Sequence, residues 1–226
     1  MKKIRKAVKG FTLIELIIVM AMMGILMIGI LNLVMPVNSI FRDSTEYQYE
    51  RATNETITNF IQARVRYATD LNILNDCASM PTGSGIYADY SIIEIDNSDR
   101  TYNNRTVRGK IAYKEPLTPK QDFMDNGFYG EYIYIFGITG SSSNFTMDIE
   151  IDKVNKKNGA DVIEKKFDST STISLKNMQV GGTSIKLHLC SDSAQLALVP
   201  ADISATASAA GLGNTYIIYK EPDPVT

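Results

Sequence analysis

The feature that most constrains this chain of 226 residues is an apolar run close to its N-terminus. No polar residue occurs from Leu16 to Leu31, and after Asn32 the apolar character resumes and continues to Val37. As a helix the whole run would be ~33 Å long, which matches the ~30 Å hydrocarbon core of a bilayer. We therefore expect a membrane-spanning helix rather than a secretory signal peptide, whose apolar region is shorter and ends in a small-residue cleavage site.

Charge is distributed unevenly along the chain. Residues 1–10 carry five basic side chains and no acid, so the rest has 23 − 5 = 18 basic and 25 acidic side chains, a net charge of −7. The basic end should stay in the cytoplasm, which directs the acidic body outward. A net charge of −2 argues against a duplex-binding protein, and one His with two Cys excludes a multi-cysteine zinc framework.

One acidic residue, Glu15, lies at the start of the apolar run. A buried acid in a membrane helix is costly and persists only if something compensates for it. The side chain could reach the lipid headgroups, or it could pair with a cation that assembly supplies.

The residues from Gly10 to Glu15 read Gly-Phe-Thr-Leu-Ile-Glu, behind a Lys-rich leader and before a long apolar run. This arrangement resembles the class III prepilin signal of type IV pilins and of the pseudopilins of type II secretion and competence machines. The resemblance implies that a prepilin peptidase cuts between Gly10 and Phe11 and N-methylates Phe11. It further implies that Glu15 guides the subunit into a helical filament of pilins, with help from the pilus assembly machinery.

Cleavage would expose an α-amino group on Phe11 whose reference pKa of ~7.7–8.0 keeps it mostly cationic. Glu15 could pair with that amine on a neighbouring subunit, because an unpaired buried charge is far worse than a paired one. Phe11 and Glu15 are also four residues apart on one helix face, so an internal pair is possible before assembly. We hypothesise that both pairings occur in sequence.

Gly24, Gly29 and Pro36 lie inside the expected helix. Glycine weakens a helix interior, and proline removes a backbone hydrogen bond and tends to kink the helix. Filaments of the resembled family often unwind between a Gly and a Pro, so Gly24 and Pro36 are candidate kink positions. A melted segment and a mildly kinked continuous helix both stay open.

The helical pattern continues beyond Val37, so we expect one helix from about residue 11 to about residue 75. Its second half carries an apolar stripe at three- and four-residue spacing, which should pack on a sheet. The stripe consists of Ile57, Ile61, Val65 and Ala68. The expected parts are a cleaved basic leader at 1–10, a transmembrane or filament-core helix at 11–37, an amphipathic helix at 38–75, and a globular head at 76–226 with a variable C-terminal region.

Strands are predicted in the head by alternation of apolar and polar residues. The alternating runs are 145–152, 173–176 and 185–189. Tyr132–Phe136 and Tyr216–Tyr219 are apolar on both faces and should be central strands, and 155–159 should be a hairpin loop. The predicted fold class is α+β, a long N-terminal helix packed on an antiparallel sheet.

Cys77 and Cys190 are the only cysteines. Many pilins close a C-terminal loop with a disulfide, although usually a shorter one. A bridge here would stabilise the head by about 4 kcal/mol in the chain-entropy model. The strand alternation opposes it, since it places Cys190 on the polar face together with His188. A bridge and two free thiols both stay open.

No metal, cofactor or catalytic site is expected. His188 is predicted to be a solvated side chain, and the chain scarcely offers further zinc ligands. Two acidic groups could suit calcium, as in some pseudopilins, or could be solvated surface: Asp148, Glu150 and Asp152, and Asp122 with Asp125. Basic residues form no compact stripe in the head, so nucleic acid is not an expected partner. The nearest candidate is the group Arg100, Arg105, Arg108 and Lys110.

The leading hypothesis is a structural subunit of a type IV pilus that serves adhesion, motility or surface attachment. The large head favours a minor pilin. The precursor would lie in the bacterial cytoplasmic membrane and the assembled subunit in an extracellular pilus. One alternative is a pseudopilin of a type II secretion or competence DNA-uptake machine. Another is a membrane-anchored extracellular binding module, which leaves Gly10 and Glu15 unexplained.

Overall fold

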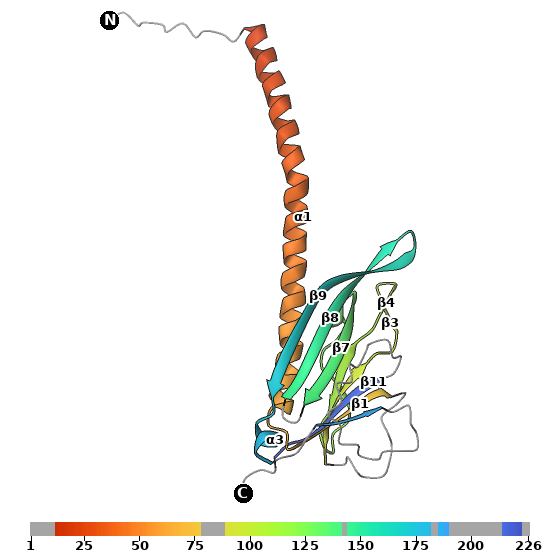
Figure 1. The fold of residues 1–226 in the computed structure, drawn as a ribbon. Helices are drawn as coiled ribbons and strands as arrows, with labels where there is room; N and C mark the ends of the chain where they lie inside the picture. Colours follow the sequence, from red (N-terminus) through yellow and green to blue (C-terminus); the bar gives the residue numbers. More distant parts are fainter. Residues whose placement is uncertain (1–11, 78–88, 142–143, 182–184, 190–213, 223–226) are drawn as a thin grey trace, which may run out of the picture. The chain divides into compact units, whose positions relative to one another are not determined.

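The computed structural model describes residues 12–77, 89–141, 144–181, 185–189 and 214–222. The chain divides into two compact units, residues 1–48 and residues 49–226. A single long helix, α1 (Leu13–Val65), contributes to both units, and the strands all belong to the second (Figure 1). The α+β layout of a long N-terminal helix with largely antiparallel sheets confirms the predicted fold class.

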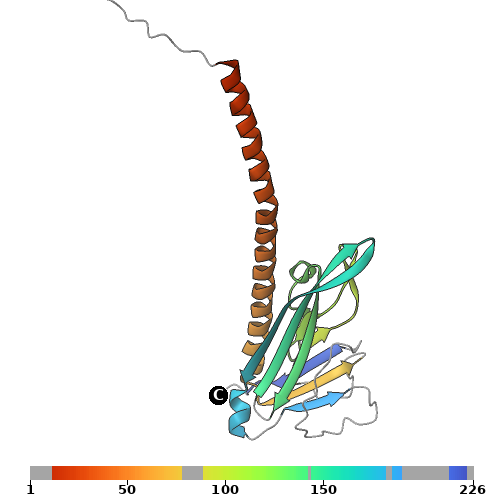
Figure 2. The same ribbon diagram turned by 45° about the horizontal axis from the view of Figure 1, so that its top comes forward.

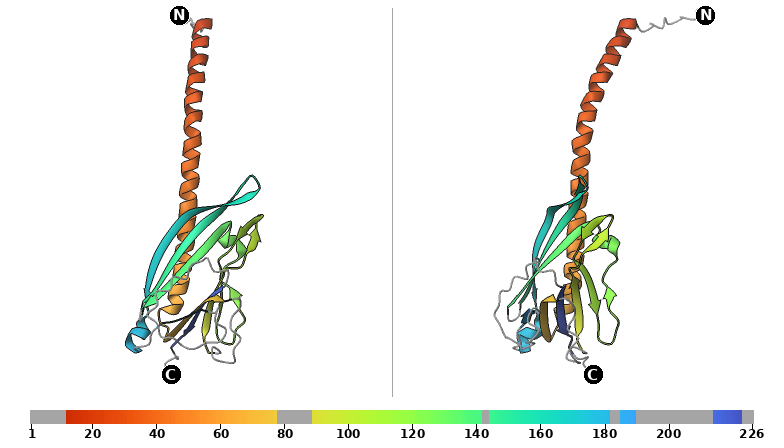
Figure 3. Two further views of the ribbon diagram at one scale, coloured as in Figure 1. Left: turned by 45° about the vertical axis from the view of Figure 1, so that its right-hand side comes forward. Right: turned by 90° about the vertical axis from the view of Figure 1, so that its right-hand side faces the viewer.

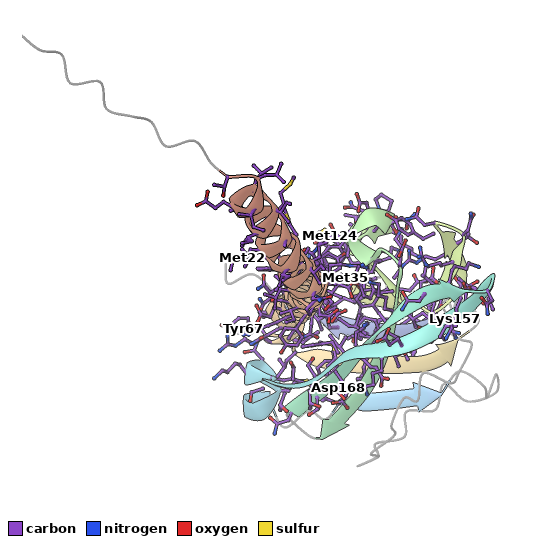
Figure 4. All side chains as sticks on the ribbon, turned by 90° about the horizontal axis from the view of Figure 1, so that it is seen from above. Met22, Met35, Tyr67, Met124, Lys157 and Asp168 are labelled. Carbon is purple, nitrogen blue, oxygen red and sulfur yellow. The ribbon has the colours of Figure 1, made fainter. Side chains whose placement is uncertain are left out.

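In the first unit, α1 is continuous through Gly24, Gly29 and Pro36. The structure therefore has the continuous alternative and no melted segment between these residues. Pro36 has no N–H for the helical ladder, and the hydroxyl of Ser39 donates to the Pro36 carbonyl at 2.8 Å. The apolar side chains of this unit are exposed, including Met22 at 63% and Met35 at 80%, both labelled in Figure 4.

The helix ends at Val65 rather than near residue 75, which corrects the predicted span of the amphipathic helix. The chain leaves the helix because the N–H of Thr69 donates to the carbonyl of Lys220 at 2.9 Å. Residues Asp70–Cys77 then form strand β1, in which Leu71 and Ile73 alternate toward the core.

The larger sheet has six strands, and the C-terminal strand of the described chain is one of its interior strands. Its order is β10 (Lys186–Leu189), β1, β11 (Asn214–Lys220), β2 (Ser91–Asp96), β5 (Lys110–Lys114) and β6 (Gln121–Asp122). The position of β11 between β1 and β2 confirms the central strand predicted at Tyr216–Tyr219. The pairing of β1 with β10 is parallel, which differs from the wholly antiparallel sheet that we expected (Figure 2).

The smaller sheet contains β7 (Tyr132–Ser141), β8 (Asn144–Lys157) and β9 (Ala160–Ser174), side by side in Figure 1. The alternation predicted at 145–152 is confirmed, since Phe145, Met147 and Ile149 on β8 are at most 1% exposed. The prediction that residues 132–136 form a central strand is wrong, because β7 lies at the edge of this sheet.

Strand β7 is nevertheless covered at both its face and its free edge. Ile133 packs with Val107 and Val154, and the N–H of Tyr134 donates to the carbonyl of Arg108 at 3.1 Å. The neighbouring Gly109 has φ +89, and a Cβ built on it would lie 2.2 Å from the Tyr134 carbonyl oxygen. Only glycine permits so close an approach of two backbones. An apolar sequence can therefore mark a covered edge strand as well as a central one.

Two hairpins close with two-residue turns whose residues have positive φ. Strands β3 (Arg100–Tyr102) and β4 (Arg105–Val107) are joined by Asn103 and Asn104, with φ of 47° and 58°. Strands β8 and β9 are joined by Asn158 and Gly159, with φ of 54° and 82°. The hairpin expected at 155–159 is thus confirmed, with a tighter loop. Two short helices complete the described elements, α2 (Asn126–Tyr129) and α3 (Lys176–Gly181).

The core of the second unit lies where the last part of α1 meets both sheets (Figure 3). The predicted stripe is confirmed, since Ile57, Ile61, Val65 and Ala68 are all fully buried. They pack with residues of the larger sheet such as Ile93 and Ile217 and with residues of the smaller sheet such as Tyr134 and Met147. Burial of these side chains is the dominant force that holds the helix on the head.

Candidate functional site

The N-terminal end of α1 is fixed by a reciprocal contact between Thr12 and Glu15. The Glu15 carboxylate accepts from the Thr12 backbone N–H at 2.9 Å and from the Thr12 hydroxyl at 2.8 Å, both through Oε2. In return the Glu15 N–H donates to the Thr12 hydroxyl oxygen at 3.4 Å. This is the capping-box arrangement, in which a Thr at the N-cap and a Glu three residues later satisfy each other's polar groups.

The helix beyond this cap is apolar, so the Glu15 carboxylate lies at the start of a long apolar segment. No charged residue occurs from Leu16 to Phe41, so Glu15 is the only ionisable side chain between Leu13 and Phe41. Within the described chain, α1 is the one helix long and apolar enough to cross a membrane, and its apolar window has a mean hydropathy of 2.7 and none of its surface buried. The other predicted site residues, Gly10 and Phe11, lie outside the described residues.

The second unit begins at Tyr49, which ties α1 to the head. The Tyr49 hydroxyl donates to the backbone carbonyl of Phe128, and its ring stacks on Tyr132 with centroids 5.7 Å apart. Burial of the phenol raises the pKa of Tyr49, so it stays a hydrogen-bond donor at neutral pH. The contact of Tyr49 with the head was not predicted, because this residue lies outside the aliphatic stripe.

The acidic face of β8 does not converge on a cation site. Asp148 accepts from the hydroxyl of Thr170 at 2.6 Å, and Glu150 forms an ion pair with Lys165 at 3.2 Å. Lys165 also pairs with Asp168, which is labelled in Figure 4, at 3.1 Å. The pKa of Lys165 is raised by its bonds to these two carboxylates.

Asp152 differs from its neighbours on β8, since it is 7% exposed and its Oδ1 atom is buried with no hydrogen-bond partner. Burial raises the pKa of Asp152, repulsion from Glu150 adds to the shift, and attraction to Lys165 opposes it. Across the described ranges, no three His, Cys, Asp or Glu side chains are grouped so that they could hold a metal ion. Asp125 instead caps α2 by accepting from the Phe128 N–H at 2.9 Å.

The basic cluster of the head is largely neutralised by acidic side chains. Arg105 pairs with Glu131, and two further pairs are Arg108–Asp99 at 3.7 Å and Lys110–Asp122 at 2.7 Å. Arg100 lies over the ring of Tyr129, with its guanidinium carbon 5.2 Å from the centroid. The contacts of the three arginines hold the β3–β4 hairpin in place, and the Lys110–Asp122 pair links β5 to β6, so the cluster has a structural role.

The remaining candidates are Cys77, Cys190 and His188. Cys77 is the last residue of β1, and Cys190 lies outside the described residues. In the parallel register of β1 with β10, Asn75 pairs with Leu189, the residue before Cys190. The disulfide stays a prediction. His188 lies within β10, and the side chains of this strand are outside the described part of the structure.

Residues 5–31 match the family model of the prokaryotic N-terminal methylation motif. No curated protein and no solved structure matches the chain. The matched segment includes Gly10, Phe11 and Glu15 and the apolar run from Leu16 to Leu31. The chain therefore carries the class III prepilin signal, which supports membership of the type IV pilin and pseudopilin family.

Several consequences follow from the prepilin signal itself. The signal implies processing by a prepilin peptidase and assembly with pilin subunits in general, and together with the apolar N-terminal helix it fits a membrane-anchored precursor. It points to a structural subunit rather than to an enzyme.

The role of Thr12 was not predicted, although the sequence carries a signal for it. The pattern Thr-x-x-Glu before an apolar run is the sequence signature of a capping box.

Proposed function

We propose that this chain is a structural subunit of a type IV pilus, and specifically a minor pilin. Its precursor is cut between Gly10 and Phe11, and the new N-terminus on Phe11 is methylated. Residues 1–10 are then the leader, and residues 11–37 form the membrane and filament-core helix. The prepilin signal at residues 5–31 supports this proposal, and the size of the head favours a minor subunit.

The observation that carries the proposal is the isolation of Glu15. It is the only ionisable side chain in the apolar part of α1, and within the described chain its carboxylate accepts two hydrogen bonds, both from Thr12 to Oε2. A carboxylate is costly in hydrocarbon unless it is paired. Such a residue is expected where a second molecule supplies the opposite charge.

Thr12 is the positioning residue in this scheme. Cleavage frees the α-amino group of Phe11, whose reference pKa of ~7.7–8.0 leaves it mostly protonated at neutral pH. Within the described residues, Glu15 Oε1 accepts no hydrogen bond, so an incoming ammonium can bind Oε1 while Thr12 keeps Oε2. Assembly then adds a partner to Glu15 without first removing one, and the charge pair favours a single axial register between subunits.

Mass spectrometry of the N-terminus of the chain, isolated from sheared surface filaments, tests the proposal. We expect a chain that begins with N-methylated Phe11 and is present at far lower copy number than the major subunit. A chain that keeps Met1 in the assembled filament contradicts the processing. Retention in the cell envelope, together with loss of secretion or DNA uptake when the chain is deleted, contradicts the pilus and favours a pseudopilin.

Substitutions at the cap separate assembly from processing. Glu15→Ala should leave cleavage at Gly10 intact and sharply reduce incorporation into filaments. Thr12→Val removes the hydroxyl but keeps the backbone contact, so we expect an intermediate loss, whereas Thr12→Ser should behave as the wild type. If Glu15→Ala enters filaments as well as the wild type does, the pairing role is wrong.

A further inference from the structure

One turn of the head holds a bulky side chain in a backbone conformation that this chain elsewhere gives to small or turn-forming residues. In the described residues, seven positions have positive φ, and six of them are Asn or Gly. These six are Asn103, Asn104, Asn158, Gly109, Gly130 and Gly159. The seventh is Leu117, with φ +63, and it is 100% exposed. A bulky aliphatic residue in this region is a genuine outlier.

The turn is held in this conformation by Thr118. The Thr118 N–H donates to the Glu115 carbonyl at 3.1 Å, the Thr118 hydroxyl donates to the same carbonyl at 2.9 Å, and the Glu115 N–H donates to the Thr118 hydroxyl oxygen at 3.1 Å. Pro116 suits the first central position of such a turn, and the second normally requires Gly or Asn. The backbone of this turn therefore favours Gly or Asn at the position that Leu117 occupies.

Packing of Leu117 against the head does not offset this strain. A fully exposed leucine buries no apolar surface, so neither packing nor backbone preference accounts for it within the chain. A strained residue that surrounding bonds hold firmly is a reason to look for a function of its side chain.

We propose that Leu117 is an apolar anchor that inserts into a pocket on the head of an adjacent pilin subunit. The inference rests on the proposed function, which supplies the neighbour. Two exposed charges of opposite sign, Lys114 and Glu115, directly precede Pro116 and Leu117, so one apolar side chain follows polar ones on the surface. A buried apolar anchor inside a polar rim is the usual anatomy of a protein interface.

The turn lies at one end of the larger sheet. The turn joins β5 to β6 at the end of the larger sheet where Lys114 pairs with Ile92 and where, two strands away, Asp70 pairs with Lys220. That is also the end at which α1 gives way to β1, since Thr69 bonds to Lys220. Subunits aligned in one direction must meet through two different surfaces. We assign Leu117 to one of these two surfaces, at the end of the larger sheet where β1 begins.

Two variants of the full-length chain test the proposal together. Leu117→Asn removes the apolar group and places in the turn a residue that tolerates positive φ, whereas Leu117→Met keeps an apolar side chain and the strain. We expect Leu117→Asn to raise the Tm of the purified chain in detergent by about 2–4 °C. Its content in sheared filaments should fall by roughly ten-fold, while Leu117→Met stays close to the wild type in both measurements.

The outcomes separate this inference from the proposed function. Equal incorporation of Leu117→Asn and wild type overturns the anchor, and a fall in Tm overturns it too, because it would mean that Leu117 stabilises its own head. Absence of the wild-type chain from filaments overturns the proposed function, and the inference with it. A photocrosslinking residue at position 117 should form adducts with another pilin, and adducts confined to other proteins would contradict the assigned partner.

Discussion

Gly109 offers the most decisive test of how the head is packed. It follows Arg108, whose carbonyl accepts from Tyr134 on β7, and it has φ +89. A Cβ at this position would lie 2.2 Å from the Tyr134 carbonyl oxygen, 2.7 Å from its Cβ and 2.9 Å from its carbonyl carbon. Two of these three atoms belong to the backbone, so no side-chain rotation can relieve the clash. Gly109→Ala must displace β7 or the β4–β5 connection.

Gly159 supplies a matched control. Its φ of +82 is close to that of Gly109, but a Cβ built on it meets no atom within 4 Å. Gly159→Ala should therefore cost only the backbone strain, about 1–2 kcal/mol of the free energy of unfolding. Gly109→Ala should cost that amount and in addition about 1–3 kcal/mol for the steric overlap. The difference between the two variants isolates the close approach of the two backbones.

Chemical denaturation of the full-length chain in detergent, followed by circular dichroism, measures both free energies. We expect Gly109→Ala to unfold at clearly lower denaturant concentration than Gly159→Ala. Equal destabilisation of the two variants, within about 0.5 kcal/mol, would refute the claim that β7 is held against this backbone.

Two further predictions concern buried charge and covalent linkage. Because burial raises the pKa of Asp152, its charged form penalises the folded state at neutral pH, and this penalty is relieved as pH falls through the raised pKa toward 3.8. Asp152→Asn should thus raise the free energy of unfolding by roughly 1 kcal/mol at pH 7, and this increase should shrink on acidification. An increase that denaturation curves show to be independent of pH would contradict an origin in the buried charge. We also predict a disulfide between Cys77 and Cys190, since β1 and β10 are neighbouring strands with Asn75 opposite Leu189. Thiol titration of denatured, unreduced protein should then find no free thiol, and Cys77→Ser should lose about 4 kcal/mol of stability. Two titratable thiols would show that the bridge does not form.

Local periodicity was sufficient for the elements whose burial depends on near neighbours in the sequence. The stripe at Ile57, Ile61 and Val65 has helical spacing and is buried as expected. The alternation on β8 likewise gave the correct buried face. In both cases the sequence pattern and the packing direction share one period.

Pairing between distant segments could not be predicted from the sequence. Leu71 fits both a helical stripe and an alternating strand, and the choice is made by Lys220, a partner 151 positions from Thr69. The apolar run at 132–136 indicated a central strand, but the β3–β4 hairpin and Arg108 cover β7 instead. Such competition among distant partners leaves no local signal.

The candidate site was predictable in part, for the same reason. The Thr-x-x-Glu spacing of the cap is local and could have been read, whereas the positive φ of Leu117 could not, because a Pro-Leu pair does not ordinarily specify such a turn. The contact of Tyr49 with Phe128 spans 79 positions and required the folded head.

The length of the uncharged part of α1 has a consequence for where its final apolar residues reside. From Leu16 to Phe41 the helix is ~39 Å long, which exceeds a ~30 Å hydrocarbon layer. With Glu15 near one boundary, an upright helix leaves Ile40 and Phe41, 65% and 67% exposed, beyond the opposite boundary. Tilting reduces this hydrophobic mismatch only at a cost. Packing against neighbouring helices in a filament can cover Ile40 and Phe41. Transfer from the bilayer to a filament would therefore bury apolar surface that the bilayer leaves in water.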